Sequence, residues 1–294
     1  MVASWFQTLI SPLRLKISPQ RLRKYGFVLN DFLNGTETRE KAVKELSQEM
    51  VSWRDLDEVE KIIGYSFSNK SLLHQAFTHP SYNRGCTSYE RLEYVGDSVL
   101  NLLITKKQFM LYPDLPPGCL TPLRAANVDT EKLARVAVKH GFHKYLRHER
   151  AVIARRIQSF INVLPKYPLH SHGLIDAPKV LADVVESTVG AVFIDSNASI
   201  DTTWEVTSSL LEPFITPDML QMNPVKKLFE ICQKHRLDVR FVDHWAKEGT
   251  YEVFVEDHLR GRGQCHSKKE VALNRAANVA YNEVVKLLES KESC

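Results

Sequence analysis

Hydrophobic residues recur at helical spacing through most of the chain between Leu56 and Ile215. LDEVEKIIGYSF places its apolar residues on one face, and SLLHQAFTH follows it and stops at Pro80. Strand-type alternation is nearly absent, so we expect an all-α domain. Further helices are predicted over YERLEYVGDSVLNLLITKKQFMLYP, TPLRAANVDTEKLARVAVKHG and PKVLADVVESTVGAVFIDS, with a loop at about 164–177 before the last of them.

The pattern changes after about Pro224. PVKKLFEICQKH predicts an amphipathic helix, DVRFVDHWAKEG and TYEVFVEDHL carry β-type residues around a turn at 247–249, and RGRGQCHS indicates another turn before the helix KKEVALNRAANVAYNEVVKLLES. A helix, a short sheet and a second helix make a separate α+β domain. We therefore expect an N-terminal extension at 1–52, a helical domain at 53–216, a linker at 217–223 and the α+β domain at 224–290.

Composition places the 294-residue chain among globular proteins, with 44% hydrophobic and 25% charged residues. No apolar run approaches the roughly 18 residues that span a bilayer, so no membrane segment is expected. The five cysteines form no CxxC pair, which argues against a disulfide framework and favours a reducing compartment. The net charge of +4 permits nucleic-acid binding without demanding it.

The first thirty residues contain five Lys or Arg and no acid. That composition is typical of an organelle transit peptide, and a basic arm that packs on the domain or touches RNA is the alternative. Nucleus, cytoplasm and plastid therefore remain open as compartments.

The stretch YERLEYVGDSVL sets three carboxylates, Glu90, Glu93 and Asp97, among core-forming residues. Their i, i+3, i+7 spacing places them on one helix face, although like charges at that spacing destabilise a helix. Gly96 has no Cβ and so lets another backbone or a ligand approach closely.

A second acidic pair, Asp183 and Glu186, lies one turn apart in the apolar segment VLADVVESTVGAVF. Burying a carboxylate is costly unless it is paired or bound to a cation. Lys179 precedes Asp183 by one turn, so an ion pair explains Asp183 but leaves Glu186 unexplained. Carboxylates on two apolar helices suggest Mg²⁺, with buried ion-pair networks as the alternative.

These segments resemble the ribonuclease III family. YERLEYVGDSVL is similar to its signature, AFTHPSYN to the segment that precedes it, and LYPDLPPGCLTPLRAANVDTEKLARVA and LADVVESTVGAVFIDS to its later blocks, in the same order. The residues after 224 resemble a double-stranded RNA-binding domain. The style of LHSHGLIDAPKVLADVVES is most similar to small plant ribonuclease III-like proteins with one domain of each kind.

The resemblance implies an endoribonuclease that hydrolyses double-stranded RNA with Mg²⁺, for which Mn²⁺ substitutes. Catalytic and metal-binding roles carry over to Glu93, Asp97, Asp183 and Glu186, and Lys179 matches a lysine expected to contact the scissile phosphate. A homodimer with a shared cleft is implied, leaving 5′-phosphates and two-nucleotide 3′ overhangs. Glu90 matches an acid with a supporting role. RNA processing and RNA silencing are the implied settings.

The C-terminal domain departs from its family pattern. HWAKEGTYEV lacks the usual Gly-Pro-x-His loop, and the third basic position of the final helix falls on Ala272 or Leu273 by register. We expect weak, shape-based RNA contact. The candidate RNA-binding residues are Glu230, His244, Lys247, Lys268, Lys269 and Arg275.

Two other functions compete with this hypothesis. The first is a catalytically weak or inactive double-stranded RNA-binding scaffold, which the complete set of acids disfavours. The second is a metal phosphohydrolase of small molecules, which the RNA-binding character of the C-terminal domain disfavours. Tyr89, Tyr94 and Trp245 are expected in the core or at interfaces rather than as stacking platforms for bases.

Overall fold

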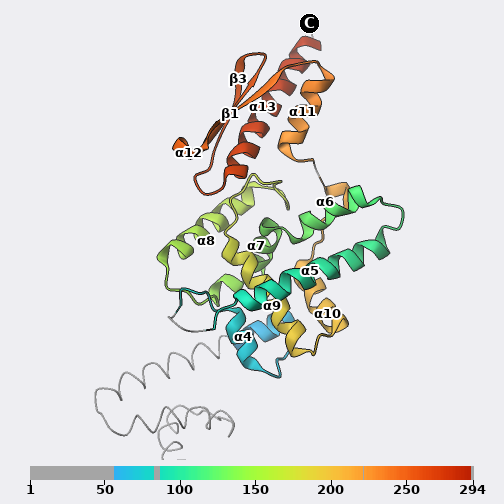
Figure 1. Cartoon of the computed structure of the whole chain (residues 1–294), viewed down its shortest axis with the longest axis vertical. Helices are drawn as coiled ribbons and strands as arrows, with labels where there is room; N and C mark the ends of the chain where they lie inside the picture. The colour runs from blue at the N-terminus through green and yellow to red at the C-terminus, as the bar shows by residue number, and fades with distance from the viewer. Residues whose placement is uncertain (1–55, 83–86, 221, 293–294) are drawn as a thin grey trace, which may run out of the picture. The chain divides into compact units, whose positions relative to one another are not determined.

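The computed structural model describes residues 56–82, 87–220 and 222–292 (Figure 1). The predicted extension at 1–52 lies outside these residues. The first part of the described chain is helical, as the periodicity predicts. After a helix at 56–63 it contains α4 (Lys70–Ala76), α5 (Glu90–Leu111), α6 (Pro117–Val128), α7 (Thr130–Lys139), α8 (Ala151–Val163), α9 (Lys179–Asp195) and α10 (Ile200–Leu211).

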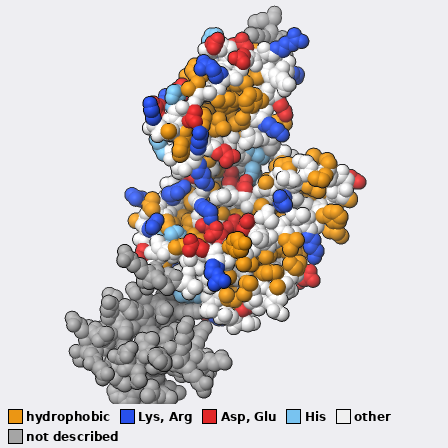
Figure 2. Space-filling model, viewed as in Figure 1, with side chains coloured by type: hydrophobic (Ala, Val, Ile, Leu, Met, Phe, Trp, Pro, Cys, Tyr) orange, Lys and Arg blue, Asp and Glu red, His pale blue; other side chains and the backbone are white. Residues whose placement is uncertain are grey.

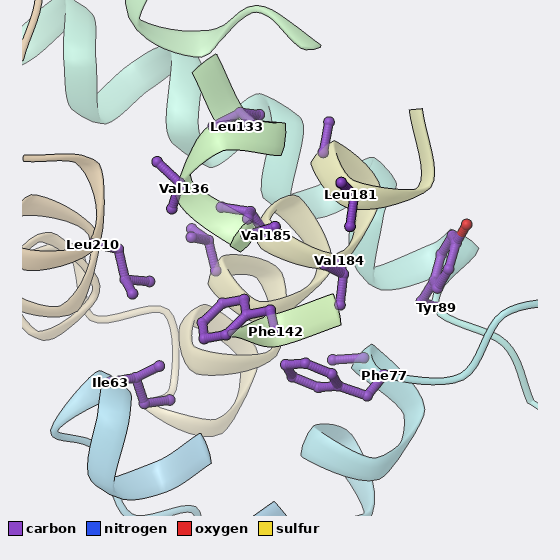
Figure 3. Close-up of a cluster of buried hydrophobic side chains, with 14 of the residues drawn as sticks. Ile63, Phe77, Tyr89, Leu133, Val136, Phe142, Leu181, Val184, Val185 and Leu210 are labelled. Carbon is purple, nitrogen blue, oxygen red and sulfur yellow. The ribbon is translucent and has the colours of Figure 1, made fainter. Parts of the chain in front are cut away.

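Helix α9 forms the centre of this domain. It contacts α4, α5, α7 and α10, and most of its residues are buried, including Val184, Val185 and Val189. Side chains from the surrounding helices, among them Leu133, Phe142 and Leu210, close around it in one cluster (Figure 3). A helix that is apolar nearly all round belongs in a core, so its few carboxylates call for a separate explanation.

Two glycines set the distance between α5 and α9. A Cβ built on Gly96 would lie 1.8 Å from the carbonyl oxygen of Glu186, and one on Gly190 would lie 2.1 Å from that of Leu92. Only a residue without Cβ permits this contact. The close approach predicted at Gly96 is thus made by the backbone of the helix that carries Asp183 and Glu186.

The predicted single helix TPLRAANVDTEKLARVAVKHG is wrong in one respect, because it is divided between α6 and α7. Asp129 ends the first helix in an extended conformation, and its side chain accepts a hydrogen bond from the Lys132 backbone N–H at 2.7 Å. An Asp N-cap of this kind begins a new helix. Periodicity alone did not mark this boundary, since the apolar spacing continues across it.

The C-terminal part contains α11 (Pro224–Lys234), β1 (Val239–His244), α12 (Trp245–Glu248), β2 (Thr250–Val255), β3 (His258–Gln264) and α13 (Lys269–Glu292). Its three strands pair antiparallel in the order β1-β2-β3. Buried residues of the sheet and both long helices, such as Leu228, Val253 and Ala276, form its own core.

One local prediction in this part is wrong. The Gly-and-Arg segment RGRG lies within strand β3 rather than in a turn, because Gly261 and Gly263 let α13 pack directly on the strand. A Cβ on either glycine would lie 2.2 Å from a carbonyl oxygen of α13. The turn predicted at 247–249 does connect β1 and β2, and it consists of the end of the one-turn helix α12 and of Gly249, which has a φ of 67°.

None of the helices in the described part of the chain combines the length and hydropathy that crossing a bilayer requires.

Candidate metal centre

Three carboxylates converge where α5 crosses α9. Glu93 from α5 and Asp183 and Glu186 from α9 each offer an oxygen, and these oxygens all lie within 4.8 Å of one another. Asp183 is only 6% exposed, while the other two are half-buried. The helical spacing of Asp183 and Glu186 directs both side chains to the same face, and the Gly96 contact brings that face to α5. We call these three residues the acid cluster.

Lys179 lies at the solvent side of the acid cluster. Its Nζ donates to Glu93 Oε1 and to Asp183 Oδ1, both at 2.6 Å. Although partial burial opposes it, the hydrogen bonds to Asp183 and Glu93 raise the pKa of Lys179, so the ammonium is retained. The i,i+4 ion pair expected from the sequence is present, and the same ammonium also joins the two helices.

The acid cluster carries more negative charge than Lys179 offsets. Burial, followed by repulsion from Asp183, Asp97 and Glu93, raises the pKa of Glu186 from 4.5 to about 7. Burial also raises the pKa of Asp183, against the opposing effect of the Lys179 hydrogen bond. A buried group of carboxylates that resists ionisation is an arrangement that a divalent cation relieves.

The other two predicted acids lie outside the acid cluster. Asp97 is exposed and accepts a hydrogen bond from Asn101 Nδ2 at 3.0 Å, although it is near enough to Glu186 to raise that residue's pKa. Glu90 is exposed and accepts a hydrogen bond from Ser88 Oγ at 2.7 Å. The three acids of α5 were predicted to share one face, but of these three only Glu93 lies in the acid cluster.

Tyr89 is a site residue that the sequence did not single out. It is 3% exposed, as expected of a core residue, but its hydroxyl donates to Asp183 Oδ2 at 3.0 Å. Burial and the neighbouring Asp183 raise the pKa of Tyr89, so the hydroxyl remains a donor. Its position next to the signature acids was the only signal in the sequence, and adjacency in sequence does not reveal a contact with α9.

The donor set of the acid cluster fits a hard divalent cation. Mg²⁺ and Mn²⁺ take carboxylate oxygens, and Mg²⁺ usually keeps several waters, so three acids and the solvent side of the site suffice. Glu93, Asp183 and Glu186 are the residues that would hold the ion, with Asp97 adjacent to Glu186. A cation held there would compete with the exposed Lys179 ammonium for Glu93 and Asp183.

The predicted RNA-binding residues of the final helix differ in their surroundings. Lys269 donates to Asp243 Oδ2 at 2.7 Å and lies over the ring of Tyr251. Hydrogen bonds from Lys269, from the Trp245 backbone and from Tyr251 lower the pKa of Asp243 to about 2. Lys268 is half-buried at the N-terminal side of α13. Lys269, the more exposed of these two lysines, is thus already paired with an acid.

The third basic position expected on the final helix falls on an uncharged residue in either register. Ala272 is fully buried and Leu273 is half-buried, and neither side chain carries a charge. Arg275 donates from Nη1 to the carbonyl of Gln264 at 2.6 Å, which ties α13 to the end of β3.

The remaining predicted RNA contacts lie on α11 and around the first turn of the sheet. Glu230 is exposed on α11, and Lys247 is exposed on α12. His244 Nε2 lies 3.6 Å from Glu252 Oε2 on the neighbouring strand. These three residues are accessible to solvent, but their contacts do not favour an RNA-binding role over that of ordinary surface residues.

The family model and the relatives found by comparison with known proteins all indicate the same family. The Ribonuclease III domain model matches residues 90–197, which include the acid cluster, Glu90 and Asp97. Ribonuclease 3-like protein 3 of Oryza sativa subsp. japonica is 47% identical over 240 residues, covering 80% of this chain and 80% of that protein.

Two further relatives match a similar share of this chain. Ribonuclease 3-like protein 2 of Arabidopsis thaliana is 42% identical over 252 residues, covering 81% of this chain and 61% of that protein. Endoribonuclease Dicer homolog 1 of Oryza sativa subsp. japonica is 41% identical over 247 residues, which correspond to 81% of this chain but only 13% of that protein. The fold, the acid cluster and these likenesses agree, and the chain belongs to the ribonuclease III family, close to its plant ribonuclease 3-like members.

Proposed function

We propose that this protein is a Mg²⁺-dependent endoribonuclease that hydrolyses phosphodiester bonds of double-stranded RNA, with Mn²⁺ as a substitute. The convergence of Glu93, Asp183 and Glu186 within 4.8 Å is the observation that carries the proposal. Keeping three carboxylates together in a partly buried site destabilises the folded state unless a cation or another partner compensates their charge. The family and the relatives named as endoribonucleases support the same activity.

The proposed chemistry divides between the cation and the side chains. When bound, a divalent ion activates water and stabilises the leaving oxygen of the phosphodiester. Glu93, Asp183 and Glu186 would hold the ion, and Asp97 would add negative charge beside Glu186. Lys179 stands on the open side of the acid cluster, where its ammonium can pair with the scissile phosphate once it leaves the two acids.

A homodimer is part of the proposal, and the surface of α5 supports it. Tyr94, Leu102 and Phe109 lie on one stripe of this helix and are 79%, 54% and 72% exposed. Figure 2 shows hydrophobic side chains gathered on the surface in the region where Figure 1 places α5. Exposed apolar stripes of this kind mark association sites, and this one runs beside the acids, so a second copy would border the same site.

The C-terminal part is proposed to bind duplex RNA as a double-stranded RNA-binding domain. The helix α11, the three antiparallel strands and the long α13 support this assignment, as do Lys268 and Lys269 at the start of α13. The pairing of Lys269 with Asp243 favours weak binding, so this domain would assist the nuclease. The boundaries at 53–216, 217–223 and 224–290 belong to the same proposal.

The proposed products are duplexes with 5′-phosphates and two-nucleotide 3′ overhangs, one strand being cut by each subunit. The test is incubation of a long, end-labelled RNA duplex with the full chain, with Mg²⁺ and with excess chelator. We expect discrete short duplexes only with the metal, and sequencing of both ends gives the overhang. Binding of the duplex without cleavage would favour the scaffold function, and cleavage in chelator would overturn the metal mechanism.

A further inference from the structure

The segment AFTHPSYN resembles a family block but has no role in the function proposed above. In the structure two of its residues, Thr78 and His79, adjoin Tyr89. The Tyr89 backbone N–H donates to the carbonyl of Thr78 at 2.9 Å, and the ring of His79 packs edge-on against the Tyr89 ring with the centroids 5.8 Å apart. The segment therefore holds Tyr89 from both its backbone and its side chain.

His79 is itself fixed by its neighbour. Its Nδ1 accepts a hydrogen bond from the Ser81 backbone N–H at 2.9 Å and lies 2.8 Å from Ser81 Oγ. The imidazole thus has a set orientation when it packs against Tyr89. Because Tyr89 directly precedes α5, this arrangement also fixes where the helix that carries Glu93 begins.

The Tyr89 hydroxyl points out of the hydrophobic cluster in which its ring takes part (Figure 3). It reaches Asp183 Oδ2 at 3.0 Å, while Asp183 Oδ1 accepts from Lys179 at 2.6 Å. The two oxygens of this carboxylate therefore have separate partners. The terminal torsion of an aspartate is broad, so a hydrogen bond to one oxygen determines where the other points.

We propose that Tyr89 is a positioning residue: held by the Thr78–Ser81 segment, its hydroxyl occupies one oxygen of Asp183 and directs the other oxygen toward a divalent cation in the acid cluster. The inference rests on the proposed metal centre. Hydrogen bonds to the outer oxygen of a ligating carboxylate orient the ligand, and their loss typically lowers metal affinity about 10–100-fold. Tyr89 touches neither substrate nor cation in this arrangement and acts through Asp183.

Helix α9 offers a matched control at its other end. Tyr65 donates from its hydroxyl to Asp195 Oδ2 at 2.9 Å, and Asp195 also accepts from the backbone of Ser68 and Asn69. The same chemical group thus meets the same type of acid on the same helix, away from the acid cluster. Tyr65→Phe removes an equivalent hydrogen bond and tests the structural role alone.

The experiment is a titration of the full chain with Mn²⁺ in the absence of RNA, followed by electron paramagnetic resonance, with thermal unfolding measured in parallel. We expect Tyr89→Phe to weaken Mn²⁺ binding about tenfold or more relative to wild type. Tyr65→Phe should leave the affinity within about twofold of wild type, whatever it does to the melting temperature.

The possible failures are distinguishable. If wild type binds no Mn²⁺, the proposed metal centre is wrong; if wild type binds and Tyr89→Phe binds equally well, only the positioning role is overturned. Should Tyr89→Phe not fold, His79→Ala is measured instead, because it removes the ring beside Tyr89 and leaves the hydroxyl. A several-fold loss of Mn²⁺ affinity is expected for that variant, and an unchanged affinity would overturn the inference.

Discussion

The carbonyl oxygen of Glu186 lies against Gly96, so close that a Cβ on Gly96 would come within 1.8 Å of it. Only a shift of the α5 or α9 backbone could make room for a methyl group. The contact therefore determines both the packing of the two central helices and the distance between Glu93 and the α9 acids. Stability and metal binding should depend on it together.

Gly96→Ala should destabilise the protein by about 1–3 kcal/mol or more through overpacking, even though alanine favours a helix. The melting temperature and Mn²⁺ affinity should both fall, because separating the helices also separates the acid cluster. The matched control is Gly118→Ala in α6, where a Cβ meets nothing within 4 Å. That variant should be unchanged or slightly more stable, and equal effects of the two substitutions would contradict the role given to Gly96.

The raised pKa of Glu186 predicts a pH dependence of stability in the metal-free protein. Between its ordinary pKa of 4.5 and about 7, the folded protein keeps a proton that the unfolded chain has lost. The contribution of Glu186 to stability therefore falls as the pH rises through this window. In chelator from pH 5 to 8, the melting temperature of Glu186→Gln relative to that of wild type should rise with pH. Parallel pH profiles would refute the assignment.

The same proton competes with a cation for Glu186. Metal affinity should therefore rise with pH up to about 7 and level off above it. A Mn²⁺ titration at several pH values checks this in the wild-type protein. An affinity that does not change between pH 5.5 and 8 would contradict it.

The apolar stripe of α5 predicts a homodimer that charged substitutions dissociate. Leu102→Glu combined with Phe109→Glu should convert the protein to a monomer, because each places a carboxylate in a surface that association buries. Light scattering after size exclusion, at micromolar concentration, measures the mass. Val152→Glu, at a 47% exposed position on α8, is the control and should leave the mass unchanged. A wild-type monomer would contradict the dimer.

The pairing of Lys269 with Asp243 predicts that RNA binding can be strengthened. Asp243→Asn removes the carboxylate that holds the ammonium at 2.7 Å, which frees Lys269 for phosphate. We expect tighter binding of duplex RNA and a salt dependence steeper by about one counterion. Filter binding over a range of salt concentrations measures both. If Asp243→Asn binds RNA with the wild-type affinity and salt dependence, the ion pair does not limit RNA binding and the prediction is wrong.

The helical domain could be predicted well because its signals are local. The apolar spacing of α5 and α9 and the i,i+3 pairs of acids determine which residues share a face, and the family resemblance identified the acids. What periodicity missed were boundaries made by single side chains, such as the Asp129 cap between α6 and α7. The strand through Gly261 and Gly263 was missed because two glycines indicate a turn unless a helix is known to lie against them.

The candidate site was predictable in its ligands but not in its arrangement. Helical spacing placed Glu93 and Asp97 together, yet only Glu93 enters the acid cluster, and Asp97 lies exposed beside it. The contact of Tyr89 with Asp183 joins residues 94 positions apart in the sequence, and no local pattern contains it. Likewise, the sequence suggested the pair of Lys179 with Asp183 but not its second contact with Glu93.

The central claim is metal-dependent cleavage of duplex RNA by the acid cluster, and single-turnover cleavage by Glu186→Gln tests it most directly. Glu205→Gln, which changes an exposed acid of α10, is the matched control. With Mg²⁺, we expect wild type and Glu205→Gln to cut a long duplex at similar rates. Glu186→Gln should be slower by about a hundredfold or more with its fold and RNA binding retained. Cleavage by Glu186→Gln at the wild-type rate would contradict the account.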